Sequence, residues 1–252
     1  MEIKEVFLYF IFIICGLIIG SFLNVAIYRI PRKISIIKLS SFCPHCNKKI
    51  AFYDNIPIIS YIILKGKCRN CNAKISFVYP LVEFLTALLF LANYIFFGLS
   101  IKTLTGILLC SLLIVVSFID INFGIIPNVI VLPFAAIGLI INITSNLSRW
   151  WYPLAFSFGA FLFMLIIHLI YPKGMGMGDI KLSLMVGAFL IKNVVVALFS
   201  GFLVGSIFGL IFILAKKRKL KQTIPFGPFI SIGAVIALFW GDFILKWYTS
   251  LY

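Results

Sequence analysis

Long apolar segments follow one another along almost the whole chain, and they constrain the fold more than any other feature. A bilayer core about 30 Å thick needs about 20 apolar residues per helix. Segmentation on this basis predicts spans near 6–27, 80–98, 103–120, 125–143, 153–171, 179–191, 194–215 and 228–246. The sixth is short, so we expect a partial or tilted span there. With 63% apolar and 12% charged residues, the chain is predicted to be an all-α polytopic membrane protein.

Basic residues gather in two segments between these spans. Ten of the 22 Lys and Arg residues lie in 28–80, and five more lie in 216–221. The positive-inside rule therefore predicts that 28–79 and 216–223 face the cytoplasm, and an even number of spans then puts both termini outside. Anionic lipid accounts for the net charge of +15. Nucleic-acid binding is not expected, because no basic groove interleaved with aromatic residues accompanies the charge.

The apolar and basic segments together predict that the chain has three parts. Residues 1–27 are expected to hold a first transmembrane helix that is retained, since the apolar run is too long for a signal-peptide core and lacks a cleavage site. Residues 28–79 are expected to form a cytoplasmic loop domain. Residues 80–252 are expected to form a membrane core of seven helices.

Four of the six cysteines form two C-x-x-C pairs within 28–79, namely Cys43 with Cys46 and Cys68 with Cys71. Two such knuckles are typical of tetrahedral zinc, because each short turn places two thiolates on one ion. Disulfides are disfavoured in the cytoplasm, and a redox pair would need a βαβ pattern that is absent. Four sulfur ligands leave no open position, so a structural zinc site is predicted, with His45 as a turn residue.

Only seven acidic residues occur in the chain, and their expected depth in the membrane separates the functional candidates from the others. Asp120 ends the third span and Asp179 begins the sixth, which places both on the cytoplasmic side. An aspartate at the bilayer centre costs about 2.5–3.5 kcal/mol on insertion scales, so such acids are functional candidates. Asp242 is expected on the opposite face in a solvated position, Glu83 is a possible auxiliary, and Asp54 is expected to be a solvated turn residue.

The pair Asp120 and Asp179 suggests acid–base chemistry. The dipole of the sixth span favours a charged Asp179 at its N-terminus, whereas Asp120 lies at a helix C-terminus where the dipole opposes charge. We therefore expect Asp179 to be ionised and Asp120 to be protonated. Such a pair can hydrolyse a peptide, with one carboxylate taking a proton from water and the other polarising the carbonyl. Gly176 and Gly178 would let a substrate backbone approach closely.

Several motifs occur together and in a fixed order. They are Gly20–Val25, Tyr28–Pro31, the four-cysteine loop with Asp54–Pro57, Tyr79–Glu83, Asp120 seven residues before Pro127, Gly176–Leu182 and Ile224–Pro228. Taken jointly, they resemble the type IV prepilin peptidases, membrane aspartyl proteases with a G-x-G-D motif. One departure is Asn128, because many members carry an aspartate there.

The resemblance implies that Asp120 and Asp179 are the catalytic aspartates of an enzyme in the bacterial cytoplasmic membrane, with its active site facing the cytoplasm. It implies that the substrates are prepilins or pseudopilins, whose basic leader is removed after a glycine. Members with the cysteine loop commonly then methylate the new N-terminal amine with S-adenosylmethionine. No nucleotide-binding fingerprint is present, so methyl transfer rests on the resemblance alone, and no oligomeric state is predicted.

Three alternatives remain open. The chain could be a peptidase without methyltransferase activity. A transporter or proton channel could also use paired membrane acids, and it would conduct ions or solutes without cleaving peptides. A zinc-ribbon membrane adaptor would use its helices only as an anchor, and its loop would bind a partner without help from the aspartates.

Overall fold

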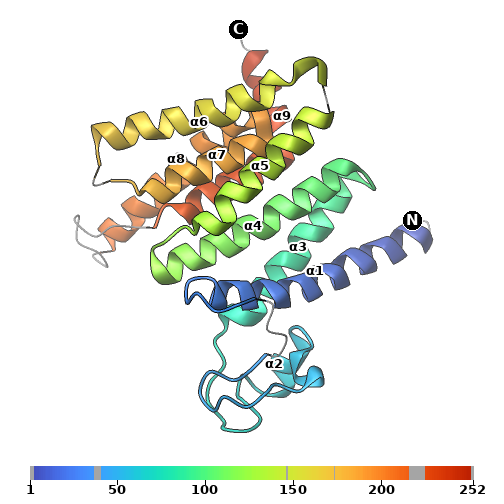
Figure 1. Cartoon of the computed structure of the whole chain (residues 1–252). Helices are drawn as coiled ribbons and strands as arrows, with labels where there is room; N and C mark the ends of the chain where they lie inside the picture. The colour runs from blue at the N-terminus through green and yellow to red at the C-terminus, as the bar shows by residue number, and fades with distance from the viewer. Residues whose placement is uncertain (1–2, 37–40, 146, 173, 216–224, 251–252) are drawn as a thin grey trace. The chain divides into compact units, whose positions relative to one another are not determined.

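The computed structural model describes residues 3–36, 41–145, 147–172, 174–215 and 225–250, and helices are the only regular elements within these ranges (Figure 1). The long helices are α1 (Ile3–Arg29), α3 (Val78–Phe97), α4 (Ile101–Phe123), α5 (Asn128–Ser145), α6 (Trp151–Ile170), α7 (Met177–Leu190), α8 (Val194–Leu214) and α9 (Gly227–Thr249). Each predicted span corresponds to one of them. The chain is therefore an all-α, multi-pass membrane protein, as the sequence predicted.

Helix α7 has only 14 residues, which confirms that the sixth predicted span is short. By length and composition the described residues contain seven apolar runs able to cross a membrane, and one of these is the 36-residue run Met177–Phe212. A 3-10 turn at Ile191–Asn193 divides this run into α7 and α8. Ile191 has a φ of 51°, which breaks the helical path and makes α7 a separate helix.

The chain divides into two compact units, Met1–Val115 and Val116–Tyr252. In the first unit, α1 and α3 pack closely in opposite directions. A Cβ atom added to Gly16 would lie 2.5 Å from Ala87 Cα, and one added to Gly20 would lie 2.7 Å from Glu83 Cα. The Asn24 side chain also donates a hydrogen bond to the Tyr79 carbonyl at 3.0 Å. Small residues thus let two membrane helices approach backbone to backbone.

The four-cysteine loop joins α1 to α3 and contains the short helix α2 (Ile59–Ile63) (Figure 1). A 3-10 turn, η1 (Phe52–Asn55), precedes α2. The two isolated bridges described in this loop are Phe42 with Lys49 and Lys67 with Lys74, one at each cysteine pair.

In the second unit, α7 contacts α5, α6, α8 and α9. Its buried residues lie on every face of the helix, so it has no lipid-facing stripe. Polar groups help to fix it: Ser157 of α6 donates to the Leu184 carbonyl at 2.7 Å, and Asn142 of α5 donates to the Ala188 carbonyl at 2.8 Å. These contacts hold the helix that carries Asp179 in place from several sides.

Candidate active site and metal centre

Asp179 lies in the first turn of α7, and its side chain folds back onto the start of the helix. Its Oδ2 accepts a hydrogen bond from the Gly176 N–H at 3.0 Å, while its own N–H donates to the Gly176 carbonyl at 3.1 Å. Gly176 is the N-cap and has an extended backbone. The carboxylate thus satisfies one of the N–H groups that a helix start leaves unpaired, and the helix dipole favours its charge.

The second carboxylate oxygen of Asp179 has no hydrogen-bond partner among the residues that the structure describes. The residue is only 6% exposed. Buried carboxylate oxygens in folded proteins are nearly always hydrogen-bonded, so a buried oxygen without a partner calls for an explanation. A water molecule or a substrate group would supply the missing donor.

Asp120 lies in the last turn of α4 and is 5% exposed. Its Oδ2 accepts a hydrogen bond of 3.0 Å from the N–H of Gly227, which is the first residue of α9 and lies 107 residues later. Asp120 is therefore at the C-terminus of its own helix and at the N-terminus of another. Both carboxylates thus lie at a helix N-terminus, so the opposed helix dipoles expected from the sequence do not by themselves make Asp179 ionised and Asp120 protonated.

Ile126 links the surroundings of the two acids. Its side chain would lie 2.8 Å from a Cβ added to Gly178, the residue before Asp179. The same side chain would lie 3.3 Å from a Cβ added to Gly227, the residue that donates to Asp120. The two carboxyl groups also interact electrostatically. The structure therefore brings Asp120 and Asp179 into one site within the second unit.

Sequence reasoning did not assign a role to Ile126 or Gly227. Gly227 lies inside the motif Ile224–Pro228, and Ile126 lies directly before Pro127, which is also part of the pattern that carries the resemblance. Their contacts with the acids depend on tertiary packing. Asn128, the departure from the family pattern, accepts a hydrogen bond of 3.0 Å from Lys181 near the surface.

The other acids lie elsewhere. Asp242 forms an exposed ion pair with Lys192, in which the two charged groups are 2.9 Å apart. This agrees with the solvated role expected for Asp242. Glu83 belongs to α3 in the first unit, is buried, and accepts a hydrogen bond of 2.8 Å from the Ile58 N–H.

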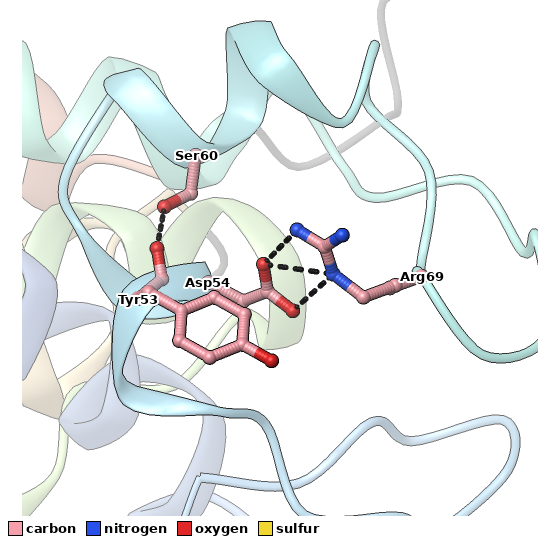
Figure 2. Close-up of polar contacts among 4 residues, drawn as sticks. All are labelled: Tyr53, Asp54, Ser60 and Arg69. Atoms are coloured by element: carbon pink, nitrogen blue, oxygen red, sulfur yellow. Dashed lines mark hydrogen bonds and ion pairs between the residues drawn. The ribbon is translucent and has the colours of Figure 1, made fainter.

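Asp54 lies in the turn η1, as expected, but it is not simply solvated. Arg69 donates to both of its carboxylate oxygens, with distances of 2.6–3.1 Å (Figure 2). This hydrogen bonding holds the pKa of the Asp54 carboxyl below its ordinary value. Ser60 donates to the neighbouring Tyr53 carbonyl at 2.8 Å. The turn is thereby tied to α2 and to the second cysteine pair, since Arg69 lies inside that pair.

The four cysteines of the loop form a single cluster. The sulfur atoms of Cys43, Cys46, Cys68 and Cys71 all lie within 4.8 Å of one another, and those of Cys43 and Cys71 are 3.8 Å apart. Four sulfurs at about 2.3 Å from a tetrahedral zinc ion would be about 3.8 Å from each other. The cluster therefore has the residues and the spacing to hold a metal ion.

The two cysteine pairs have the same backbone structure. In each, the N–H of the first cysteine donates to the carbonyl five residues later, at 3.0 Å for Cys43 and 2.9 Å for Cys68. The N–H four residues later donates back to that cysteine, at 2.8 Å from Asn47 and 2.9 Å from Asn72. Both asparagines have left-handed backbones, with φ of 54° and 56°. This residue type tolerates that conformation well.

The backbone also favours a thiolate at Cys68. The N–H groups of Cys71 and Asn70 point at its sulfur and lower its pKa to about 7. The thiolate is the form of cysteine that binds metals.

Comparison with known proteins shows which family the chain resembles. Residues 14–97 match the family model described as the bacterial peptidase A24 N-terminal domain, and residues 107–214 match the type IV leader peptidase family. Three similar relatives carry the name prepilin leader peptidase/N-methyltransferase. The one from Bacillus subtilis (strain 168) is 38% identical, covering 96% of this chain and 98% of the relative.

The relative from Aeromonas salmonicida (strain A449) is 35% identical over 93% of this chain and 91% of its own length. The relative from Legionella pneumophila is 33% identical over 97% of this chain and 95% of its own length. No solved structure matches the chain.

Proposed function

The chain belongs to the type IV leader peptidase family, and we propose that it removes the leader of a prepilin or pseudopilin with Asp120 and Asp179 as its catalytic pair. The observation that carries this proposal is the meeting of two buried acids at one site, one with an unpaired oxygen. A carboxylate pair in a buried site can activate water and polarise a carbonyl at the same time.

The hydrogen bonds suggest a role for each acid. Asp179 uses Oδ2 to accept the Gly176 N–H, which leaves Oδ1 to take a proton from the attacking water. Asp120 uses Oδ2 to accept the Gly227 N–H, and we assign to its other oxygen the proton that is given to the scissile carbonyl. Water then forms the new C–O bond. When the C–N bond breaks, the proton held by Asp179 passes to the leaving amine, and Asp120 regains its own proton from the intermediate.

The glycines near Asp179 would admit the extended substrate. Gly176 has an extended backbone and Gly178 packs against Ile126, so no side chain from either residue stands beside the carboxylate. We place this site at the cytoplasmic face, because the basic segments 28–79 and 216–223 are expected there. The family's leaders are themselves basic, so backbone and pocket contacts would have to select the substrate.

We also propose that the cysteine cluster holds zinc. The ion would stabilise the loop, since four sulfur ligands leave no position for water or substrate. The relatives' name includes N-methyltransferase. By that likeness the chain would also methylate the new N-terminus, and S-adenosylmethionine, when bound, would supply the methyl group.

Incubation of the full chain in detergent with a full-length prepilin tests the peptidase. We expect mass spectrometry to find one cut after the glycine that ends the leader, and a further gain of one methyl group when S-adenosylmethionine is added. A transporter or channel would instead give ion or solute flux in vesicles and leave the prepilin intact. An intact prepilin would overturn the proposal.

Gly227 offers a sharper test of the site. A Cβ at this position would lie 2.7 Å from Asp120 Oδ2 and 3.3 Å from Ile126 Cδ1. Gly227→Ala should therefore displace the Asp120 carboxyl and lower kcat for leader cleavage about 100-fold, as expected for a displacement of about 1 Å. The matched control is Gly209→Ala on α8, where no atom lies within 4 Å of the added Cβ. Equal kcat values for the two variants would contradict the role of Gly227.

A further inference from the structure

The last turn of α6 carries His168, whose ring reaches the segment that leads into α7. Its Nδ1 lies 2.9 Å from the carbonyl oxygen of Met175, the residue before the N-cap Gly176. A carbonyl oxygen only accepts hydrogen bonds, so Nδ1 carries a hydrogen and donates it. The end of α6 is thereby tied to the glycine-rich turn that precedes Asp179.

The Met175 carbonyl and the Gly176 N–H belong to one peptide group. That N–H is the group that donates to Asp179 Oδ2 at 3.0 Å. The peptide bond is trans, so its C=O and N–H point in opposite directions within one plane. His168 and Asp179 therefore bind opposite ends of the same peptide group, and the three groups form one chain of hydrogen bonds.

This peptide group depends on an anchor. Glycine follows it, and a glycine on one side lets a peptide group rotate with little steric resistance. A rotation that turned the Gly176 N–H away would remove the hydrogen bond that holds Asp179 Oδ2. The bond from His168 opposes this rotation, because turning the plane would break both hydrogen bonds at once. It also polarises the amide, which strengthens the N–H as a donor.

Closing the end of α6 does not account for the position of the His168 ring. A histidine in the last turn of a helix can bind the last carbonyls of that helix. Here the backbone makes the closing bonds: the Tyr171 N–H donates to the Ile167 carbonyl at 2.9 Å, and the Gly174 N–H donates to the Tyr171 carbonyl at 3.0 Å. The carbonyl that His168 binds lies beyond this turn, in the motif that presents Asp179.

We propose that His168 is a positioning residue for leader cleavage. It fixes the peptide group between Met175 and Gly176, and the Gly176 N–H then holds Asp179 with Oδ1 left to take the proton from water. This inference rests on the proposed function, because His168 acts through Asp179 and not on the substrate.

The test compares two replacements of His168 in the full chain in detergent. His168→Leu has no donor, whereas the side-chain amide of His168→Asn can donate from nearly the position of Nδ1. His168→Leu should lower kcat for prepilin cleavage about tenfold, the upper range for losing one hydrogen bond, and leave KM within about twofold. His168→Asn should keep at least about half of the wild-type kcat, because it restores the donor.

A spectroscopic measurement reads the same contact without turnover. The infrared difference between each protein and its Asp179→Asn derivative isolates the bands of the Asp179 carboxyl group. Loss of the Gly176 donor should shift these bands in His168→Leu, and His168→Asn should restore them. A purely structural role would lower the Tm of His168→Leu without moving the bands. The control is Ser206→Ala on α8, which loses one exposed hydrogen bond to the Phe202 carbonyl and should change neither the bands nor kcat.

Unshifted Asp179 bands in His168→Leu would overturn the inference, and so would equal losses of kcat in His168→Leu and His168→Asn. A rise in KM at an unchanged kcat would also overturn it, since the ring would then act on substrate binding. If the wild-type chain cleaves prepilin, any of these results refutes this inference alone. Shifted bands in a chain that cleaves no prepilin would support the link from His168 to Asp179 and refute the peptidase.

Discussion

Replacing Asp179 with Asn should lower kcat for leader cleavage by about 10³-fold or more, and Asp120→Asn should do the same. An amide cannot take a proton from water or give one to the carbonyl, and positioned acid–base groups typically contribute about 10²–10⁴ in rate. The proposed mechanism uses the two acids as one unit, so the double variant should be no slower than about the slower single variant. Quantitative mass spectrometry of the released leader measures these rates.

The control for this experiment is Asp242→Asn. Asp242 pairs with Lys192 in an exposed position, and we expect its replacement to leave cleavage within about twofold of the wild type, as for most surface substitutions. Cleavage at the wild-type rate by either Asp179→Asn or Asp120→Asn would refute the catalytic pair.

Removing the second cysteine pair should have the largest effect on the loop. The double variant Cys68→Ser and Cys71→Ser leaves only two sulfur ligands. Structural zinc contributes about 10–16 kcal/mol of folding free energy in small zinc domains, so the loop should lose its fold together with the ion. We expect zinc to fall from one ion per chain to almost none, and limited proteolysis to cut within residues 41–77.

The matched control is Cys15→Ser in α1, which lies outside the cluster and should keep its zinc. A double variant that keeps one zinc ion per chain and resists the protease would contradict the metal site.

The sequence was sufficient to predict the helices, and it singled out two acids that the structure brings to one site. Each predicted span is a helix because long apolar runs have few alternatives in a bilayer, where backbone groups must be satisfied within the chain. Asp120 and Asp179 could be singled out because acidic residues are rare in this chain. The cysteine cluster also followed from local spacing, since each knuckle is a short turn.

Contacts between distant segments could not be predicted in the same way. The hydrogen bond from Gly227 to Asp120 joins residues 107 positions apart, and it changes the electrostatic argument about that acid. The contacts of Ile126 with both glycines depend on how α4, α5, α7 and α9 pack. The pairing of Asp54 with Arg69 likewise depends on how the loop folds, so a turn motif alone suggested only a solvated acid.

The short length of α7 has a consequence for the lipid. Fourteen residues at about 1.5 Å each give a helix about 21 Å long, whereas the hydrocarbon layer is about 30 Å thick. The far end of α7 is followed by Lys192, whose exposed ion pair with Asp242 belongs at a membrane surface. With that end at one surface and α7 along the bilayer normal, the start of α7 would lie roughly 9 Å below the other surface, and Asp179, two residues further along, about 12 Å below it. With Asp179 as a catalytic residue, as we propose, hydrolysis would take place in a recess of the bilayer, and the thickness of the surrounding lipid would set how far water and the scissile bond must descend to meet.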